Sequence, residues 1–62
     1  MFEEKLFELQ EKAEDIAVRA MLELKPDIAE EVAKIWDNLR FGKILLDDAV
    51  TQIEEVEKKL AA

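Results

Sequence analysis

The chain contains no cysteine, histidine or tyrosine, no serine, and only one proline and one glycine. Without cysteine it has neither disulfides nor thiolate metal sites, and without histidine only carboxylates remain as side-chain metal ligands. The lack of serine, cysteine and histidine also excludes the usual nucleophile–base pairs of covalent catalysis. A single glycine cannot build a phosphate-binding loop. We therefore expect no catalytic, cofactor or metal site, and we expect that the protein is not an enzyme.

Long apolar runs and an excess of basic charge are also missing. No apolar run approaches the ~18 residues of a membrane span, and the first four residues, MFEE, do not resemble a signal peptide. Acidic residues outnumber basic ones sixteen to nine, for a net charge of -7. This balance disfavours nucleic acid and anionic membranes, because both are bound through Lys and Arg. We expect a cytoplasmic protein that binds neither, and a basic protein partner stays open.

Glu, Lys, Leu, Ile and Ala dominate the 62 residues. This composition is typical of hyperthermophile proteins and of designed helical bundles, and both origins stay open. Residues 1–62 suffice for a single domain, and a domain of this size buries only roughly 60% of the surface that its unfolded chain exposes. Without disulfides or metals, such a domain is stabilised by very regular helix packing or by association.

The lone proline and the lone glycine divide the chain into three segments with helical periodicity. Apolar residues recur every three or four positions over residues 2–24, 27–41 and 46–60, which is the spacing of one helix face. Connections this short make successive helices antiparallel. We predict an all-α protein, an antiparallel three-helix bundle with helices at about these positions, in which Trp36 anchors the core.

The helix ends carry signals of their own. We expect the first helix to keep Leu24 on its apolar stripe and to end before Pro26, because the residue before a proline is disfavoured in the α conformation. Asp27 is expected to cap the second helix, with Glu30 completing a capping box. Gly42 is expected to take the left-handed conformation that ends the second helix.

Two short stretches are similar to a known family. Residues 2–6 (FEEKL) resemble the opening of exodeoxyribonuclease VII small subunits, and residues 42–48 (GKILLDD) are similar to that family's turn into its second long helix. The resemblance implies a non-catalytic, acidic helical subunit. In that family one helix separates the two motifs, whereas here a second helix with its own proline turn intervenes. We therefore assign fold and function from the residues alone.

Several large apolar residues do not follow the helical pattern. Phe7, Val18 and Leu22 point away from the main stripe of the first helix. Leu45 occupies the N-cap of the third helix, where Ser, Thr, Asp or Asn is preferred, so we expect this leucine to be kept for an apolar contact. The first helix is also the longest, and we expect about two of its turns to overhang near the second turn of the chain. The predicted self-association surface consists of Phe2, Leu6, Phe7, Val18, Leu22, Phe41 and Leu45.

Other interpretations of these residues stay open. The apolar residues of the second turn could instead fold back and cap the core. For the function, the leading hypothesis is a non-catalytic structural or interaction module that self-associates, most simply as a homodimer. The alternative is a small acidic binding or inhibitor subunit, antitoxin-like, that docks on a basic partner; one contiguous acidic face would favour it. An enzyme using magnesium would need four carboxylates that converge.

Overall fold

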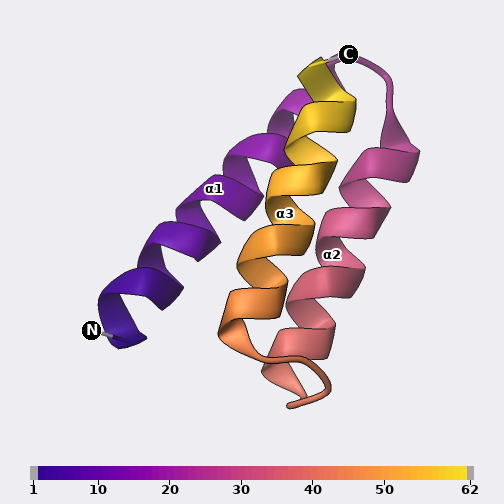
Figure 1. The fold of residues 1–62 in the computed structure, drawn as a ribbon. Helices are drawn as coiled ribbons and strands as arrows, with labels where there is room; N and C mark the ends of the chain where they lie inside the picture. The colour runs from indigo at the N-terminus through magenta and orange to yellow at the C-terminus, as the bar shows by residue number, and fades with distance from the viewer. Residues whose placement is uncertain (1, 62) are drawn as a thin grey trace.

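The computed structural model describes residues 2–61, with side chains from Glu3 onward. These residues form three α-helices, α1 (Phe2–Leu22), α2 (Pro26–Arg40) and α3 (Leu46–Ala61), and contain no strand. Successive helices run antiparallel and pack against one another (Figure 1). The predicted all-α three-helix bundle is confirmed, with helix boundaries within two residues of those expected.

The turn between α1 and α2 ends α1 two residues earlier than predicted, because the chain reverses through a left-handed residue. Leu24 has φ 58°. The N–H of Lys25 donates to the carbonyl of Ala20 at 2.7 Å, and the N–H of Leu24 donates to that of Met21 at 3.1 Å. This Schellman arrangement satisfies the last carbonyls of the helix. The prediction that Leu24 lies on the apolar stripe is therefore wrong, and its side chain is 87% exposed.

The turn between α2 and α3 has the same pattern of backbone hydrogen bonds, with a glycine in the left-handed position. Gly42 has φ 74°; its N–H donates to the carbonyl of Leu39 at 3.1 Å, and the N–H of Lys43 donates to that of Asn38 at 2.8 Å. A Cβ added to Gly42 would meet no atom within 4 Å. Glycine is thus favoured here for its backbone conformation, as predicted, and not because a side chain would clash with neighbouring atoms.

The capping box predicted at Asp27 is wrong. α2 begins at Pro26, so the N-cap is Lys25, which makes no side-chain capping hydrogen bond. The carbonyl of Lys25 accepts from the N–H of Ile28 at 3.1 Å. Proline suits the first helical position because its φ is already helical and its missing N–H would have no helical partner there. Asp27 becomes the second helical residue, where its charge still interacts favourably with the helix dipole.

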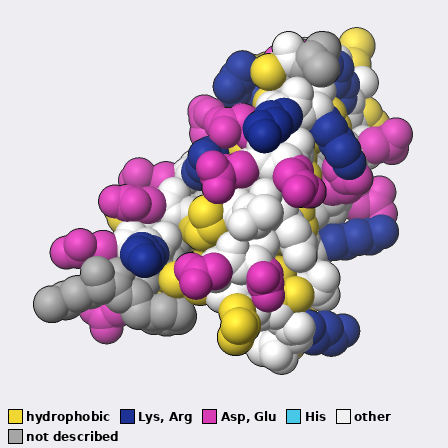
Figure 2. All heavy atoms as spheres, in the orientation of Figure 1, with side chains coloured by type: hydrophobic (Ala, Val, Ile, Leu, Met, Phe, Trp, Pro, Cys, Tyr) yellow, Lys and Arg dark blue, Asp and Glu magenta, His cyan; other side chains and the backbone are white. Residues whose placement is uncertain are grey.

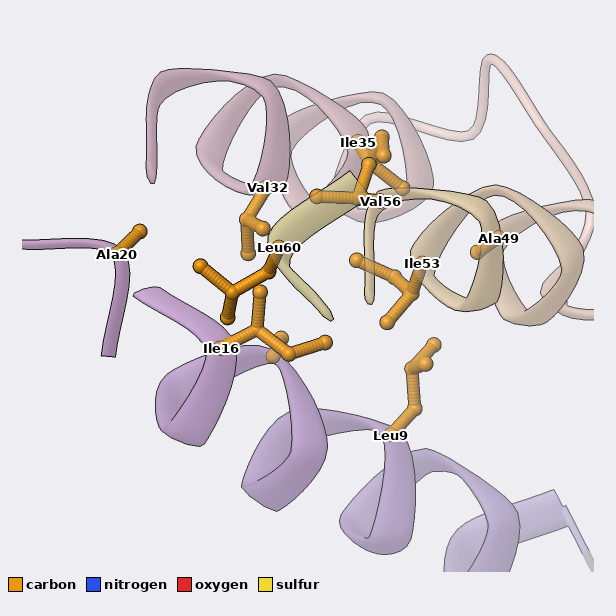
Figure 3. Close-up of a cluster of buried hydrophobic side chains, with 10 residues drawn as sticks. Leu9, Ile16, Ala20, Val32, Ile35, Ala49, Ile53, Val56 and Leu60 are labelled. Carbon is orange, nitrogen blue, oxygen red and sulfur yellow. The ribbon is translucent and has the colours of Figure 1, made fainter. Parts of the chain in front are cut away.

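The core lies where the three helices face one another (Figure 3). Its largest fully buried side chains are Ile16 of α1 and Ile53 of α3. Trp36 of α2 is half-buried and packs against this core from its edge, so it supports the core without occupying its centre. The buried side chains among the described residues are Leu9, Ala13, Ile16, Ala20, Val32, Ile35, Ala49, Ile53, Val56 and Leu60.

α1 converges with α2 and α3 near the α1–α2 turn and diverges from them toward its N-terminus (Figure 1). Alanine side chains, Ala17 and Ala20 of α1 and Ala29 of α2, lie in or against the core at the converging end, and small side chains let helix axes approach closely. Among the described side chains of α1, Leu9 is the first that is buried, while Leu6 is half-buried and outside the core. The first turns of α1 therefore do not overhang the α2–α3 turn as expected. They lean away from α2 and α3, and a groove separates them from the start of α3.

Candidate functional site

Large apolar side chains on the surface are the most prominent feature of this molecule. Seven leucine, isoleucine and valine side chains are buried among the described residues. An equal set of large apolar side chains is more than half exposed, from 58% for Val18 to 87% for Leu24. Scattered exposed apolar residues are common, but clusters of them mark interaction surfaces. The exposed set is Phe7, Val18, Met21, Leu22, Leu24, Phe41 and Leu45.

The structure distributes the residues of the predicted surface over separate places. Val18 and Leu22 lie at the C-terminal end of α1, whereas Phe41 and Leu45 lie on the α2–α3 turn at the opposite end of the bundle. Phe7 is on α1, ~16 Å from Val18 at 1.5 Å per residue. The predicted residues that are exposed in the structure do not form one continuous surface.

The two remaining residues of the predicted surface are at the start of α1. Leu6 is half-buried and is not part of the core. The prediction for Phe2 lies outside the described side chains. Of these two residues, only the half-buried Leu6 lies among the described side chains.

Four exposed aliphatic side chains cluster around the α1–α2 turn: Val18, Met21, Leu22 and Leu24. We call these four residues the corner patch. Val18 is three and four residues before Met21 and Leu22, so the three are neighbours on the helix surface. Sequence reasoning missed Met21 and Leu24. The signal for Leu24 was present, because Pro26 requires the helix to end before it and no glycine precedes it to form the turn.

The α2–α3 turn divides its apolar residues between the core and the surface. Ile44 packs against the core, as the capping alternative expects, whereas Phe41 and Leu45 stay exposed. The guanidinium of Arg40 lies 5.4 Å from the centroid of the Phe41 ring, within the range of a cation–π contact. Arg40 also donates to the carboxylate of Asp37 at 3.3 Å. Phe41 therefore already has a partner within its own chain.

Grooves run between the helices. One, about 310 Å³, separates the first half of α1 from the first half of α3; Leu9 and Val50 line it together with Lys5, Glu8, Lys12, Asp47 and Glu54. A second, about 210 Å³, lies between α1 and α2 and is lined mainly by alanine and valine, together with Trp36. A third, about 270 Å³, lies between α2 and α3, where Ile35 and Val56 line it together with Glu31, Lys34, Gln52, Glu55 and Lys59. Charged side chains of both signs line the first groove, and apolar ones dominate the second.

Acidic and basic side chains are interleaved on the surface. Figure 2 shows acids along both α1 and α3, with lysine and arginine side chains among them. Two ion pairs join different helices, Lys12 to Glu57 and Lys59 to Glu31, each at 3.1 Å. The face in Figure 2 is therefore not the contiguous acidic face that would favour an inhibitor subunit.

Within residues 2–61, no three acidic side chains are grouped in a way that would hold a metal ion. No helix in the same part of the chain is both long enough and apolar enough to cross a membrane. No protein-family model, curated protein or solved structure matches the chain. We therefore argue the function from the residues and their arrangement.

Proposed function

We propose that this protein is a non-catalytic helical interaction module that associates with a second copy of itself. The observation that carries the proposal is the exposure of as many large apolar side chains as the core buries. Removing apolar surface from water contributes about 25 cal/mol per Å². In a chain of 62 residues, burial of even some of these side chains between two copies would add substantially to a small core.

The extent of the surface supports the same proposal. The accessible area is 4621 Å², whereas the average folded monomer of this mass exposes about 4,100 Å². The radius of gyration of 11.1 Å likewise exceeds the about 10.6 Å expected for a compact chain of this length. The divergence of α1 accounts for part of this excess, and association would return some of it to a buried state.

The net charge of -7 favours a second candidate, an acidic binding or inhibitor subunit that docks on a basic protein. Such a function needs acids gathered on one face so that they act together on the partner. On the face in Figure 2, lysine and arginine side chains lie among the acids. Self-association therefore remains the better-supported proposal.

The oligomeric state tests the proposal directly. Sedimentation equilibrium from about 1 μM to about 1 mM covers the affinities expected of a small interface. We expect the weight-average mass to rise from 7.2 kDa toward twice that value as the concentration increases. A mass that stays at that of one chain over the whole range contradicts the proposal.

A further inference from the structure

We propose that the corner patch, Val18, Met21, Leu22 and Leu24, is the surface through which two copies of this chain associate end to end about a two-fold axis. This inference rests on the proposed self-association and specifies its location. In such an isologous contact the same patch of each copy faces its counterpart. The kind of partner is thus a second copy of this chain.

The four side chains of the corner patch are not part of the core of their own chain. Each of the four is more than half exposed. Val18, Met21 and Leu22 are neighbours on the helix surface, because Val18 is one helical turn before the other two, and Leu24 follows them in the turn that ends α1. The α2–α3 turn differs, because Arg40 lies against the ring of its Phe41.

The backbone conformation of Leu24 also favours a contact outside its own chain. At φ 58° it occupies the left-handed position that glycine fills in the α2–α3 turn. A leucine is disfavoured in this conformation, and its side chain, which is 87% exposed, does not pack into the core of its own chain. Contact with a second copy supplies the apolar burial that the isolated chain does not.

The charges around the patch favour a second copy of the chain as its occupant. The charged residues next to the patch along the chain, Arg19, Glu23, Lys25 and Asp27, include two of each sign, whereas the whole chain has a net charge of -7. A rim with both signs can match itself after a two-fold rotation, because acids of one copy can face bases of the other. A uniformly basic or acidic partner would meet like charges at half of the rim.

The neighbouring surface of α1 argues for contact at the end of the molecule and against contact along the helix. Phe7 and Val18 lie on one side of α1, but Glu11 and Glu14 lie between them on that same side, and both acids are exposed. Two copies packed along α1 would bring these carboxylates into a shared interface, where like charges repel. A patch of four side chains is small, so we expect a reversible dimer with a dissociation constant in the micromolar range.

Matched substitutions at the two ends of the bundle test this location. Leu22→Glu and Leu45→Glu remove the same side chain, add the same charge and start from similar exposure, 78% and 75%. We expect Leu22→Glu to raise the dissociation constant of the dimer roughly tenfold or more, as loss of a central apolar contact does, and Leu45→Glu to leave it nearly unchanged. Sedimentation equilibrium measures both constants.

A second variant keeps the test decisive if Leu22→Glu weakens the fold. Leu24→Gly removes one contact side chain while placing the favoured residue in the left-handed position. We expect this variant to be folded and yet to dissociate at higher concentrations than the wild type. Circular dichroism on the sedimentation samples confirms the fold. A Leu24→Gly dimer as tight as the wild type counts against the patch.

Met21 provides a direct probe, because it and Met1 are the two methionines of the chain. In protein labelled with ¹³C at the methionine methyl groups, the signal lost in Met21→Leu is that of Met21. We expect this signal to shift on dilution with the same midpoint as the mass.

The outcomes separate the two proposals. A wild type that remains a single chain overturns both. A dimer that Leu45→Glu disrupts, while Leu22→Glu and Leu24→Gly do not and the Met21 signal stays fixed, overturns the corner patch and leaves self-association standing. A dimer disrupted by both patch variants, with a shifting Met21 signal, supports both proposals.

Discussion

Leu24 and Gly42 occupy equivalent positions in two turns with the same hydrogen-bond pattern, and they differ in the conformational free energy of the backbone. The left-handed conformation costs a residue with a Cβ roughly 1–2 kcal/mol, whereas glycine adopts it readily. Since the side chain of Leu24 is 87% exposed, little burial offsets this cost within one chain. At the scale of single residues, the α1–α2 turn is therefore the weaker of the two.

We predict that Leu24→Gly stabilises the isolated chain. Relief of the left-handed strain exceeds the extra entropy that glycine has in the unfolded state, for a net gain of roughly 0.5–1 kcal/mol in the free energy of unfolding. The matched change Gly42→Ala should lose about 1 kcal/mol, because it introduces the same strain. Urea melts followed by Trp36 fluorescence, at concentrations where the chain is monomeric, measure both. A Leu24→Gly variant less stable than wild type under these conditions contradicts the strain argument.

Leu45 gives a second prediction at this scale. Its carbonyl accepts from the N–H of Ala49 at 3.0 Å, so it is the N-cap of α3, and its side chain is 75% exposed. The sequence predicts an apolar contact here, which would make Leu45→Asp destabilising. With the side chain exposed and the contact placed at the corner patch, we expect the opposite sign.

Leu45→Asp should raise the free energy of unfolding by about 1 kcal/mol, through a capping hydrogen bond and the helix dipole. Urea melts of this variant and of Leu45→Ala separate the cap from the loss of leucine. A Leu45→Asp variant that is both less stable and more dissociated than Leu45→Ala would restore the interface assignment of this residue.

At the scale of the helices, the two halves of α1 differ in how much of their surface is covered. The second half contributes Ile16 and Ala20 to the core with no exposure, whereas Leu6 lies outside it. The first half leans away from α2 and α3 (Figure 1). Segments with few buried contacts open at lower free energy than the global unfolding transition.

Hydrogen exchange tests this difference along α1. We expect the amides of residues 7–10 to exchange faster than those of residues 16–20, because the former open locally and the latter only on global unfolding. All these amides have helical acceptors within α1, so secondary structure alone does not produce the difference. Equal protection in both halves would show that the first half is held as firmly as the second.

At the scale of the whole molecule, net charge opposes association of identical chains. Two copies of a chain with a net charge of -7 repel, and added salt screens this repulsion over a Debye length of about 30 Å at 0.01 M and about 10 Å at 0.1 M. We predict that the dimer tightens as sodium chloride rises between these concentrations. Binding of a basic partner would weaken under the same change, because salt then screens attraction. A dimer that loosens with salt would mean that opposite charges, and not apolar contacts, hold it together.

Much of the fold could be predicted because it depends on local properties of the chain. The spacing of apolar residues follows the period of the helix, so the three helices and the side of each that faces the core could be read from the sequence. Gly42 could be assigned to its turn for the same reason, since its preference for positive φ belongs to the residue itself. The absence of histidine, cysteine and serine likewise restricts the possible chemistry, because no fold can supply a side chain that the sequence lacks.

Only the tertiary structure decided which apolar side chains stay uncovered. The choice of Lys25 over Asp27 as a cap, and of Leu24 as the left-handed residue, depends on how the chain must turn to bring α2 onto α1. The tilt of α1 depends on side chains from different helices. Small alanines let the helices approach closely near the α1–α2 turn, whereas the larger Leu9 lies in the core farther from that turn. How far Leu6, Met21 or Leu24 is exposed depends on the distance to the neighbouring helix. That distance results from packing between residues far apart in sequence.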